Sequence, residues 1–344
     1  MNKLVIASMA QSAGKTSIIT GIAKSLNMKL GYIKPFGERL IYHKKRLWDY
    51  DSALMVNIFG LEEHAEDMTI GFEYSKLRYM YDDTQRKKKL LDMVAHMGKG
   101  KDILFVEGGR DFKFGGCVSL DPISIARYIE GKLIFVISGN EGTVIDDARF
   151  IKDHLDLKDI DFGGVIINKV NNIDDFKENH LPTITEMGIP VIGIIPFNVE
   201  LTYLSVNYIS HLFFAKVIAG EKSLDRVIKN IFVGASSVES VFKDVLFKKE
   251  DKLVITSGDR SDMILAALES NSACIILTNN ILPSSNIISK ANERNIPLLL
   301  MTQDTYQIAS QMDNIEPLLT KEDSRRIEIL QKLIKDNLAL KKMI

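Results

Sequence analysis

The chain has 344 residues, which predicts two domains at about 150 residues each. Lys and Arg number 44 and Asp and Glu number 45, so the net charge is −1 and a nucleic-acid partner, which would call for a basic excess, is not expected. Cys117 and Cys274 stand far apart, so we expect neither a disulfide framework nor a cysteine-based zinc site, and a reducing compartment fits.

Apolar stretches such as 189–197 fall well short of the roughly 20 residues that a membrane span needs, so no membrane partner is expected. The N-terminus does not have the pattern of a signal peptide. We therefore expect a cytoplasmic protein.

The first 200 residues alternate short β-branched runs with helical patterns. The expected strands are 3–8, 30–34, 103–107, 133–138, 164–168 and 190–195, and the clearest helices are 16–26 and 86–97. Several of these strands are apolar on consecutive residues, as expected of strands covered on both faces. The pattern predicts an α/β fold with a mostly parallel sheet flanked by helices.

A second α/β pattern begins near residue 220. The expected strands are 252–257, 273–277 and 297–302, and the expected helices are 261–270, 284–293 and 305–312. Residues 321–341 read as one amphipathic helix with an apolar stripe, which could pack on its own chain or on a second copy. We expect three parts: a larger α/β domain over 1–217, a smaller domain over 218–318 and a C-terminal helix over 319–344.

The strongest local signal is the run from Ser8 to Ser17, which follows a strand and opens an amphipathic helix. That is the context of a phosphate-binding loop, in which backbone N–H groups and the helix N-terminus face phosphate oxygens. Met9 stands where the usual motif has its leading glycine. Lys15 is expected to reach the β- and γ-phosphates and Thr16 to coordinate Mg²⁺. The full set expected to bind nucleotide here is Ser12, Ala13, Gly14, Lys15, Thr16 and Ser17.

Two charged residues end predicted strands. Lys34 precedes a proline, which holds it extended, so it should lie at the carboxyl edge of the sheet where ligands bind in open α/β folds. There it could contact the γ-phosphate or an anionic acceptor. Glu107 ends its strand before two glycines and is well placed to hold magnesium directly or through water. For both residues, an exposed strand-end charge is the simpler alternative.

Three further candidates are weaker. Asp49 and Asp51 precede a helical pattern, and taken alone Asp51 reads as a helix N-cap. The run Asn168-Lys169-Val170-Asn171 resembles the base-reading Asn-Lys-x-Asp of GTPases, but Asn171 lacks the carboxylate that accepts hydrogen bonds from guanine, so adenine and hence ATP are favoured. A strand-end turn without nucleotide contact remains the alternative. Arg110 is a weak candidate for an anionic substrate group.

Together these segments resemble the dethiobiotin synthetase-like P-loop domain over about residues 1–215. The matching segments are 13–16, 32–35, 49–51, 106–109 and 168–170, together with 188–196, which is similar to the family's closing strand. The resemblance implies that Lys15 and Lys34 contact phosphate and acceptor, that Thr16, Asp51 and Glu107 hold magnesium, and that Asn168 faces the adenine. It also implies a homodimer.

The second block is similar to the DRTGG domain. The matching segments are 220–221, 233–235, 255–262, 276–279 and 304–306, with Asp259-Arg260-Ser261-Asp262 in place of the family's literal motif. This turn could cap a helix with an Asp–Arg pair, or Asp259 and Arg260 could form a second anionic-ligand site. The two blocks together resemble the N-terminal region of long phosphate acetyltransferases, without the acetyltransferase domain, so acetyl transfer is not expected.

Three alternative functions are compatible with these sequence features. The first is a Mg–ATP-dependent kinase or ligase acting on a small anionic metabolite, supported by the full set of lysines and carboxylates. The second is a nucleotide-binding regulatory module that controls a metabolic partner enzyme. The third is a partition-type ATPase, which would carry an extra lysine early in the loop where this chain has Ala10.

Overall fold

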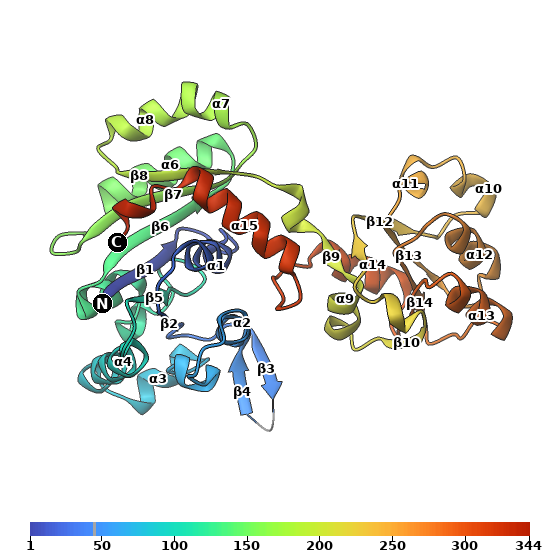
Figure 1. Ribbon diagram of the computed structural model, residues 1–344, viewed down its shortest axis with the longest axis horizontal. Coiled ribbons are helices and arrows are strands. Elements are labelled where there is room, and N and C mark those ends of the chain that lie inside the picture. The colour runs from blue at the N-terminus through green and yellow to red at the C-terminus, as the bar shows by residue number, and fades with distance from the viewer. Residues whose placement is uncertain (44–45) are drawn as a thin grey trace. The chain divides into compact units, whose positions relative to one another are not determined.

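The computed structural model describes residues 1–43 and 46–344, which form two compact units (Figure 1). Unit 1 comprises Met1–Asn198 together with Leu319–Ile344. Unit 2 comprises Val199–Leu318 and is therefore inserted into unit 1.

Unit 1 is built on six parallel strands in the order β2-β5-β1-β6-β7-β8. In chain order they are β1 (Asn2–Ser8), β2 (Leu30–Ile33), β5 (Ile103–Glu107), β6 (Lys132–Ser138), β7 (Phe162–Val170) and β8 (Val191–Pro196). Their apolar side chains are buried because helices cover both faces. The expected α/β fold with a mostly parallel sheet is confirmed.

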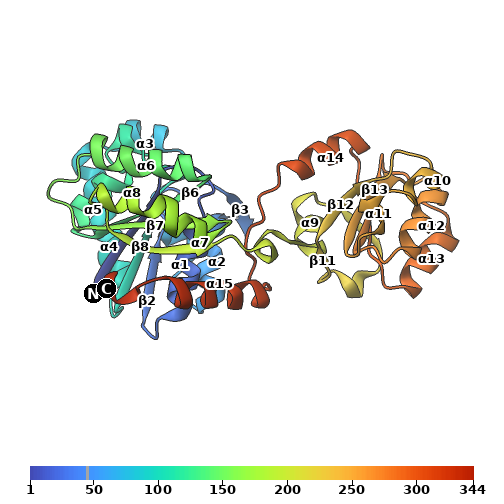
Figure 2. The same cartoon turned by 90° about the horizontal axis from the view of Figure 1, so that it is seen from above.

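The helices of unit 1 lie on both faces of this sheet (Figures 1 and 2), with α1 and α15 on one face and α4, α5, α6 and α8 on the other. They are α1 (Lys15–Ser25), α2 (Tyr50–Phe59), α3 (Tyr74–Met80), α4 (Asp83–Gly98), α5 (Pro122–Ile129), α6 (Glu141–His154), α7 (Ile173–Asp175), α8 (Leu181–Glu186) and α15 (Ser324–Asn337). Several begin at side-chain caps; Asp82 and Gln85, for example, form a capping box at the start of α4.

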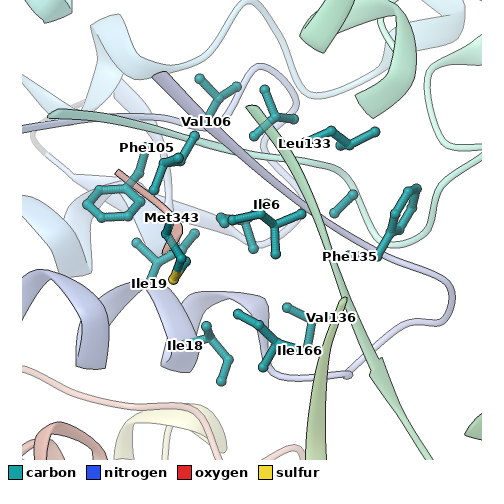
Figure 3. Close-up of a cluster of buried hydrophobic side chains, with 14 of the residues drawn as sticks. Ile6, Ile18, Ile19, Phe105, Val106, Leu133, Phe135, Val136, Ile166 and Met343 are labelled. Atoms are coloured by element: carbon teal, nitrogen blue, oxygen red, sulfur yellow. The ribbon is translucent and has the colours of Figure 1, made fainter. Parts of the chain in front are cut away.

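The core of unit 1 lies between the sheet and these helices. Figure 3 shows Ile18 and Ile19 of α1 beside Ile6 of β1 and Val136 of β6. Met343, near the C-terminus, is also buried in this core. The sequence did not indicate that so late a residue would reach the first strands.

The C-terminal helix is shorter than its sequence pattern indicated. It spans Ser324–Asn337, not 321–341, because Leu338 leaves the helix and forms an antiparallel bridge with Gly193 of β8. The amide of Ala339 then donates to the carbonyl of Ile192 at 3.1 Å. The segment thus covers the edge strand of the sheet, and the apolar stripe of the helix packs on its own unit.

Helix α15 lies along α1 at close range. A Cβ added to Gly21 of α1 would lie 2.5 Å from Cγ1 of Ile334 and 3.1 Å from the carbonyl oxygen of Leu330. Side-chain amide Nε2 of Gln331 donates to the carbonyl of Lys24 at 2.6 Å. A glycine at position 21 is therefore what lets the two helices approach.

One antiparallel hairpin was not expected from the sequence. It consists of β3 (Leu40–His43) and β4 (Arg46–Asp49) and leads directly into α2. Its second strand brings Asp49 to the start of α2.

Unit 2 has its own sheet, in the order β10-β15-β14-β13-β12, with β10 alone antiparallel. The strands are β10 (Lys216–Ala219), β12 (Asn230–Val233), β13 (Lys252–Ser257), β14 (Cys274–Thr278) and β15 (Leu298–Leu300), and β9 (Leu204–Ser205) pairs with β11 (Val227–Ile228). The helices are α9 (Val206–Leu212), α10 (Val238–Val241), α11 (Val245–Lys248), α12 (Ser261–Glu269), α13 (Ser285–Glu293) and α14 (Thr305–Asp313). Across the described parts of both units, no helix combines the length and the apolar character needed to cross a membrane.

We predict that Gly21→Val destabilises unit 1 by about 2 kcal/mol, because the added side chain overpacks the contact with α15. Urea unfolding followed by the fluorescence of Trp48, the one tryptophan of the sequence and a residue of β4, measures this. Gly142→Val is the matched control, since among the described residues a Cβ at that exposed helical position would meet only Oδ1 of Asn140, at 3.6 Å. Equal stability of the two variants would contradict the close packing of α15 on α1.

Candidate functional site

The loop between β1 and α1 is held in place from the end of β7. Gly14 has φ +99°, a left-handed conformation that favours glycine, and a Cβ there would lie 2.5 Å from Nδ2 of Asn168. That amide nitrogen donates to the carbonyl of Ala13 at 2.8 Å, and Nζ of Lys169 donates to the carbonyl of Ser12 at 2.7 Å. The Asn-Lys pair thus fixes the backbone of the loop.

Lys15 is the first residue of α1 and is only 8% exposed. Its Nζ donates to Oγ of Ser8 at 2.8 Å and to the carbonyl of Arg110 at 3.3 Å. Burial lowers the pKa of Lys15, and the charge of Glu107 partly opposes that shift. A buried lysine at a helix N-terminus is well suited to contact an anion.

Lys34 lies immediately after β2 and is almost fully buried. The register pairs Ile33 with Val106, which brings Lys34 beside Glu107, the last residue of β5. Its Nζ forms an ion pair with Oδ2 of Asp51 and lies 3.5 Å from Oε1 of Glu107. Burial by itself would lower the pKa of Lys34, but the carboxylates of Asp51 and Glu107 outweigh it and raise the pKa.

Glu107 is held by two hydroxyl groups. The Thr16 hydroxyl donates to Oε1 at 2.8 Å, and the buried Tyr32 hydroxyl donates to Oε2 at 2.9 Å. Burial raises the pKa of Glu107, while Lys34 works in the opposite direction. The carboxylate therefore has a fixed orientation beside the first turn of α1.

The two aspartates divide the roles that the sequence left open. Asp49, not Asp51, caps α2: its carboxylate accepts from the amides of Ser52 and Glu38, each at 3.0 Å. The N-cap interpretation of Asp51 is therefore wrong, because that residue lies in the first turn with its side chain turned to Lys34. Burial raises the pKa of Asp51, but the charge of Lys34 outweighs burial and lowers it overall.

Carboxylates outnumber cations in this cluster. Around Lys34 lie Asp51, Glu107 and Glu38, with the Glu38 Oε2 atom 3.7 Å from Nζ, and Arg39 lies 3.5 Å from Asp51. Asp49 and Lys15 complete the group. The excess of negative charge in this cluster favours the binding of a further cation.

The donor set fits magnesium. The Thr16 hydroxyl and the Glu107 carboxylate already touch, and Asp51 is brought near them through Lys34. Within 1–43 and 46–344, no three His, Cys, Asp or Glu side chains form a metal-holding group on their own. Magnesium beside nucleotides is usually held by one or two carboxylates, waters and the phosphates themselves, so hard oxygen donors of this kind suffice.

The remaining sequence candidates are Arg110 in unit 1, whose carbonyl accepts from Lys15, and Asp259 and Arg260 in unit 2. Arg110 is exposed and its guanidinium stacks on Phe114 at 4.8 Å. In unit 2, Arg260 forms a two-pronged pair with the carboxylate of Asp262 at 3.0 and 3.1 Å, while Asp259 is exposed. No side chain caps α12, so of the expected cap and Asp–Arg pair only the pair is present.

Sequence reasoning missed Tyr32, Ser8 and Glu38. Tyr32, in β2, stands two residues before Lys34, and alternation along extended backbone puts both side chains on one side, so this signal was available. Ser8 and Glu38 carried no such signal, because their contacts with Lys15, seven residues on, and Lys34, four residues back, form across loops that have no regular periodicity.

We predict that Lys34→Met destabilises unit 1 by about 3 kcal/mol at pH 7.5, because it leaves buried carboxylates without their cation. The stability that the depressed pKa of Asp51 contributes is present at neutral pH and is lost as pH falls through that pKa. The loss should therefore be smaller at pH 5, where the orphaned carboxylates can take up protons. Urea unfolding at both pH values, with exposed Lys152→Met as control, tests this. An equal loss at both pH values would contradict it.

Comparison with known proteins identifies both domains of the chain. Residues 2–204 match the family model described as AAA domain, and residues 209–315 match the DRTGG domain. A phosphate acetyltransferase of Pseudomonas aeruginosa is 23% identical over 95% of this chain and 49% of its own length. That of Nitrosomonas europaea is 21% identical over 98% of this chain and 50% of its own length. The chain spans about half the length of the curated relatives it matches.

Solved structures are more distant. The cell division protein MinD of Aquifex aeolicus has a TM-score of 0.36 and 18% identity, over 58% of this chain and 84% of that one. The CBS and DRTGG domains of Clostridium perfringens pyrophosphatase, complexed with diadenosine tetraphosphate, have a TM-score of 0.29 and 19% identity, over 40% of this chain and 62% of that one. The expected pairing of a P-loop domain with a DRTGG domain, as in long phosphate acetyltransferases, is confirmed. The family model covers more than half of the chain, which therefore belongs to the AAA domain family of P-loop proteins.

Proposed function

We propose that unit 1 binds ATP with Mg²⁺ and transfers the γ-phosphoryl group to a small anionic metabolite. One observation carries this proposal: Lys15, Thr16, Glu107, Asp51 and Lys34, from four separate segments, meet at the carboxyl edge of one parallel sheet. Phosphoryl transfer depends mainly on positioning and charge neutralisation, and these residues are of the types that provide both.

In this proposal Lys15 and the backbone amides of 12–17 bind the phosphates, and Thr16, Glu107 and Asp51 hold magnesium. Magnesium would supply neutralisation of phosphate charge. The existing Thr16–Glu107 hydrogen bond supports the assignment, because it brings a hydroxyl and a carboxylate oxygen to within 2.8 Å of each other. Hard oxygen ligands of this kind are those that Mg²⁺ prefers.

The choice of adenine over guanine as the bound nucleobase is based on the turn after β7. The chain has Asn171 where a guanine-reading carboxylate would stand, so we propose ATP over GTP. The amide of Asn168 already holds the carbonyl of Ala13 through Nδ2. Its side-chain oxygen is the group that we assign to adenine.

Lys34 is our candidate for the residue that stabilises the transferred group. It is paired with Asp51 and lies among three carboxylates, so an anion alone would meet an excess of negative charge. Binding of the metal and of the anionic acceptor should therefore support each other. The exposed Arg110 is a weaker candidate for the acceptor's charge. A homodimer remains a prediction from the family resemblance.

A second candidate function is a nucleotide-binding regulatory module. The DRTGG match over 209–315 and the relatives of about twice the length favour it, since this region there accompanies an acetyltransferase. In that case ATP would bind without turnover stimulated by any metabolite, and unit 2 would act on a partner enzyme.

The deciding experiment measures ADP release from Mg–ATP with a panel of carboxylates, amines and hydroxyl compounds. We predict stimulation by one class and a loss of roughly 100-fold or more in Lys15→Ala, because a positioned charge on the phosphates is removed. Lys152→Ala, an exposed lysine of α6, is the matched control and should keep full activity.

Two other outcomes are informative. ATP binding that Lys15→Ala abolishes, with no stimulation by any compound, would favour the regulatory module over the transferase. ATP binding that is equally tight in Lys15→Ala would contradict both functions.

A further inference from the structure

The chain returns from unit 2 to unit 1 at Leu319, next to the candidate site. The carbonyl of Leu319 accepts a hydrogen bond from the hydroxyl of Tyr50 at 2.8 Å. Tyr50 stands between Asp49, which caps α2, and Asp51, which pairs with Lys34. We call residues Leu319–Leu338 the return segment.

Both the backbone amide and the side-chain hydroxyl of Tyr50 form hydrogen bonds. Its backbone amide donates to the carbonyl of Arg39 at 2.8 Å, and its hydroxyl holds the return segment. A displacement of Leu319 therefore acts on the residue that joins the two site aspartates. Asp49 in turn holds the amide of Glu38, so the same displacement reaches the other end of the cluster.

The return segment also contacts the helix that begins with Lys15 and Thr16. Within α15, Gln331 donates through Nε2 to the carbonyl of Lys24, and Ile334 and Leu330 pack at Gly21 of α1. One continuous segment thus contacts both α1 and α2, the two helices that carry the expected magnesium ligands Thr16 and Asp51.

On the other side, the chain is anchored within unit 2 shortly before it leaves. The hydroxyl of Tyr208, in α9, donates to the carbonyl of Glu316 at 3.2 Å. Only Pro317 and Leu318 separate that anchor from Leu319. Because a residue spans at most about 3.6 Å, so short a connection leaves little slack between the two tyrosine anchors.

We propose that Tyr50 is a positioning residue that couples unit 2 to the nucleotide site through the return segment. The proposal rests on the proposed ATP site and adds its regulation. Ligand binding at one unit then changes the free energy of ligand binding at the other unit, by the same amount in both directions. The physical basis is the hydrogen bond from the hydroxyl of Tyr50, the residue between the two site aspartates, to the carbonyl of Leu319 in the return segment.

Hydrogen exchange on the full chain, with and without Mg–ATP, tests the coupling without knowledge of any ligand of unit 2. In the unaltered protein, Mg–ATP should slow exchange in the loop 8–17, in α15 and in α9 of unit 2. In Tyr50→Phe, which removes only the hydroxyl, protection of the loop should persist while that of α9 falls at least twofold. The same variant should need more magnesium for half-maximal ATP binding.

Two further variants make the result specific. Tyr208→Phe should likewise reduce protection of α9 and leave the magnesium requirement unchanged, because it releases the other anchor. Tyr79→Phe, at an 86% exposed position of α3, is the matched control and should behave like the unaltered protein.

Each negative result would contradict a different part of the proposal. If Mg–ATP protects the loop but leaves α9 unchanged in the unaltered protein, the coupling is wrong and the ATP site stands. If Tyr50→Phe keeps full protection of α9, the role of Tyr50 is overturned. If the loop itself gains no protection, the proposed function fails, and the coupling proposal with it.

Discussion

The buried ammonium group of Lys34 is the interaction on which the candidate site depends. It balances Asp51 and Glu107, two carboxylates that burial would otherwise protonate or expel. Because Glu107 is also bonded to Thr16, this one cation joins β2, β5, α1 and α2. A charge cluster of this kind contributes little net stability.

Much of unit 1 could be predicted from the sequence, because buried parallel strands are consecutively apolar and a phosphate-binding loop has a local signature. Glu107 was placed at its strand end, and β5 matches the expected range. The roles of Asp49 and Asp51 could not be divided, because either residue can cap a helix beginning nearby. What decided between them was Lys34, a partner 17 residues from Asp51. Long-range pairings of this kind leave no periodic signal.

The C-terminal helix illustrates the same limit. Its apolar stripe was clear, but its end was not, because Leu338 fits the stripe and also pairs with Gly193 at the sheet edge. Helical periodicity cannot register that a strand edge elsewhere competes for the residue. The hairpin β3–β4 was missed for a related reason: it is short, and its apolar residues Leu40 and Leu47 are about half exposed. In both cases tertiary contacts, not local propensity, set the structure.

The central claim is that magnesium and nucleotide share the cluster around Lys34, and calorimetric titration with ATP over a series of Mg²⁺ concentrations tests it most directly. The account predicts that Mg²⁺ tightens ATP binding at least about tenfold, or about 1.4 kcal/mol. It predicts that Asp51→Asn loses most of this gain, while its magnesium-free affinity is unchanged or higher because a negative charge is gone. ATP binding that is independent of Mg²⁺ in the unaltered protein would contradict the account.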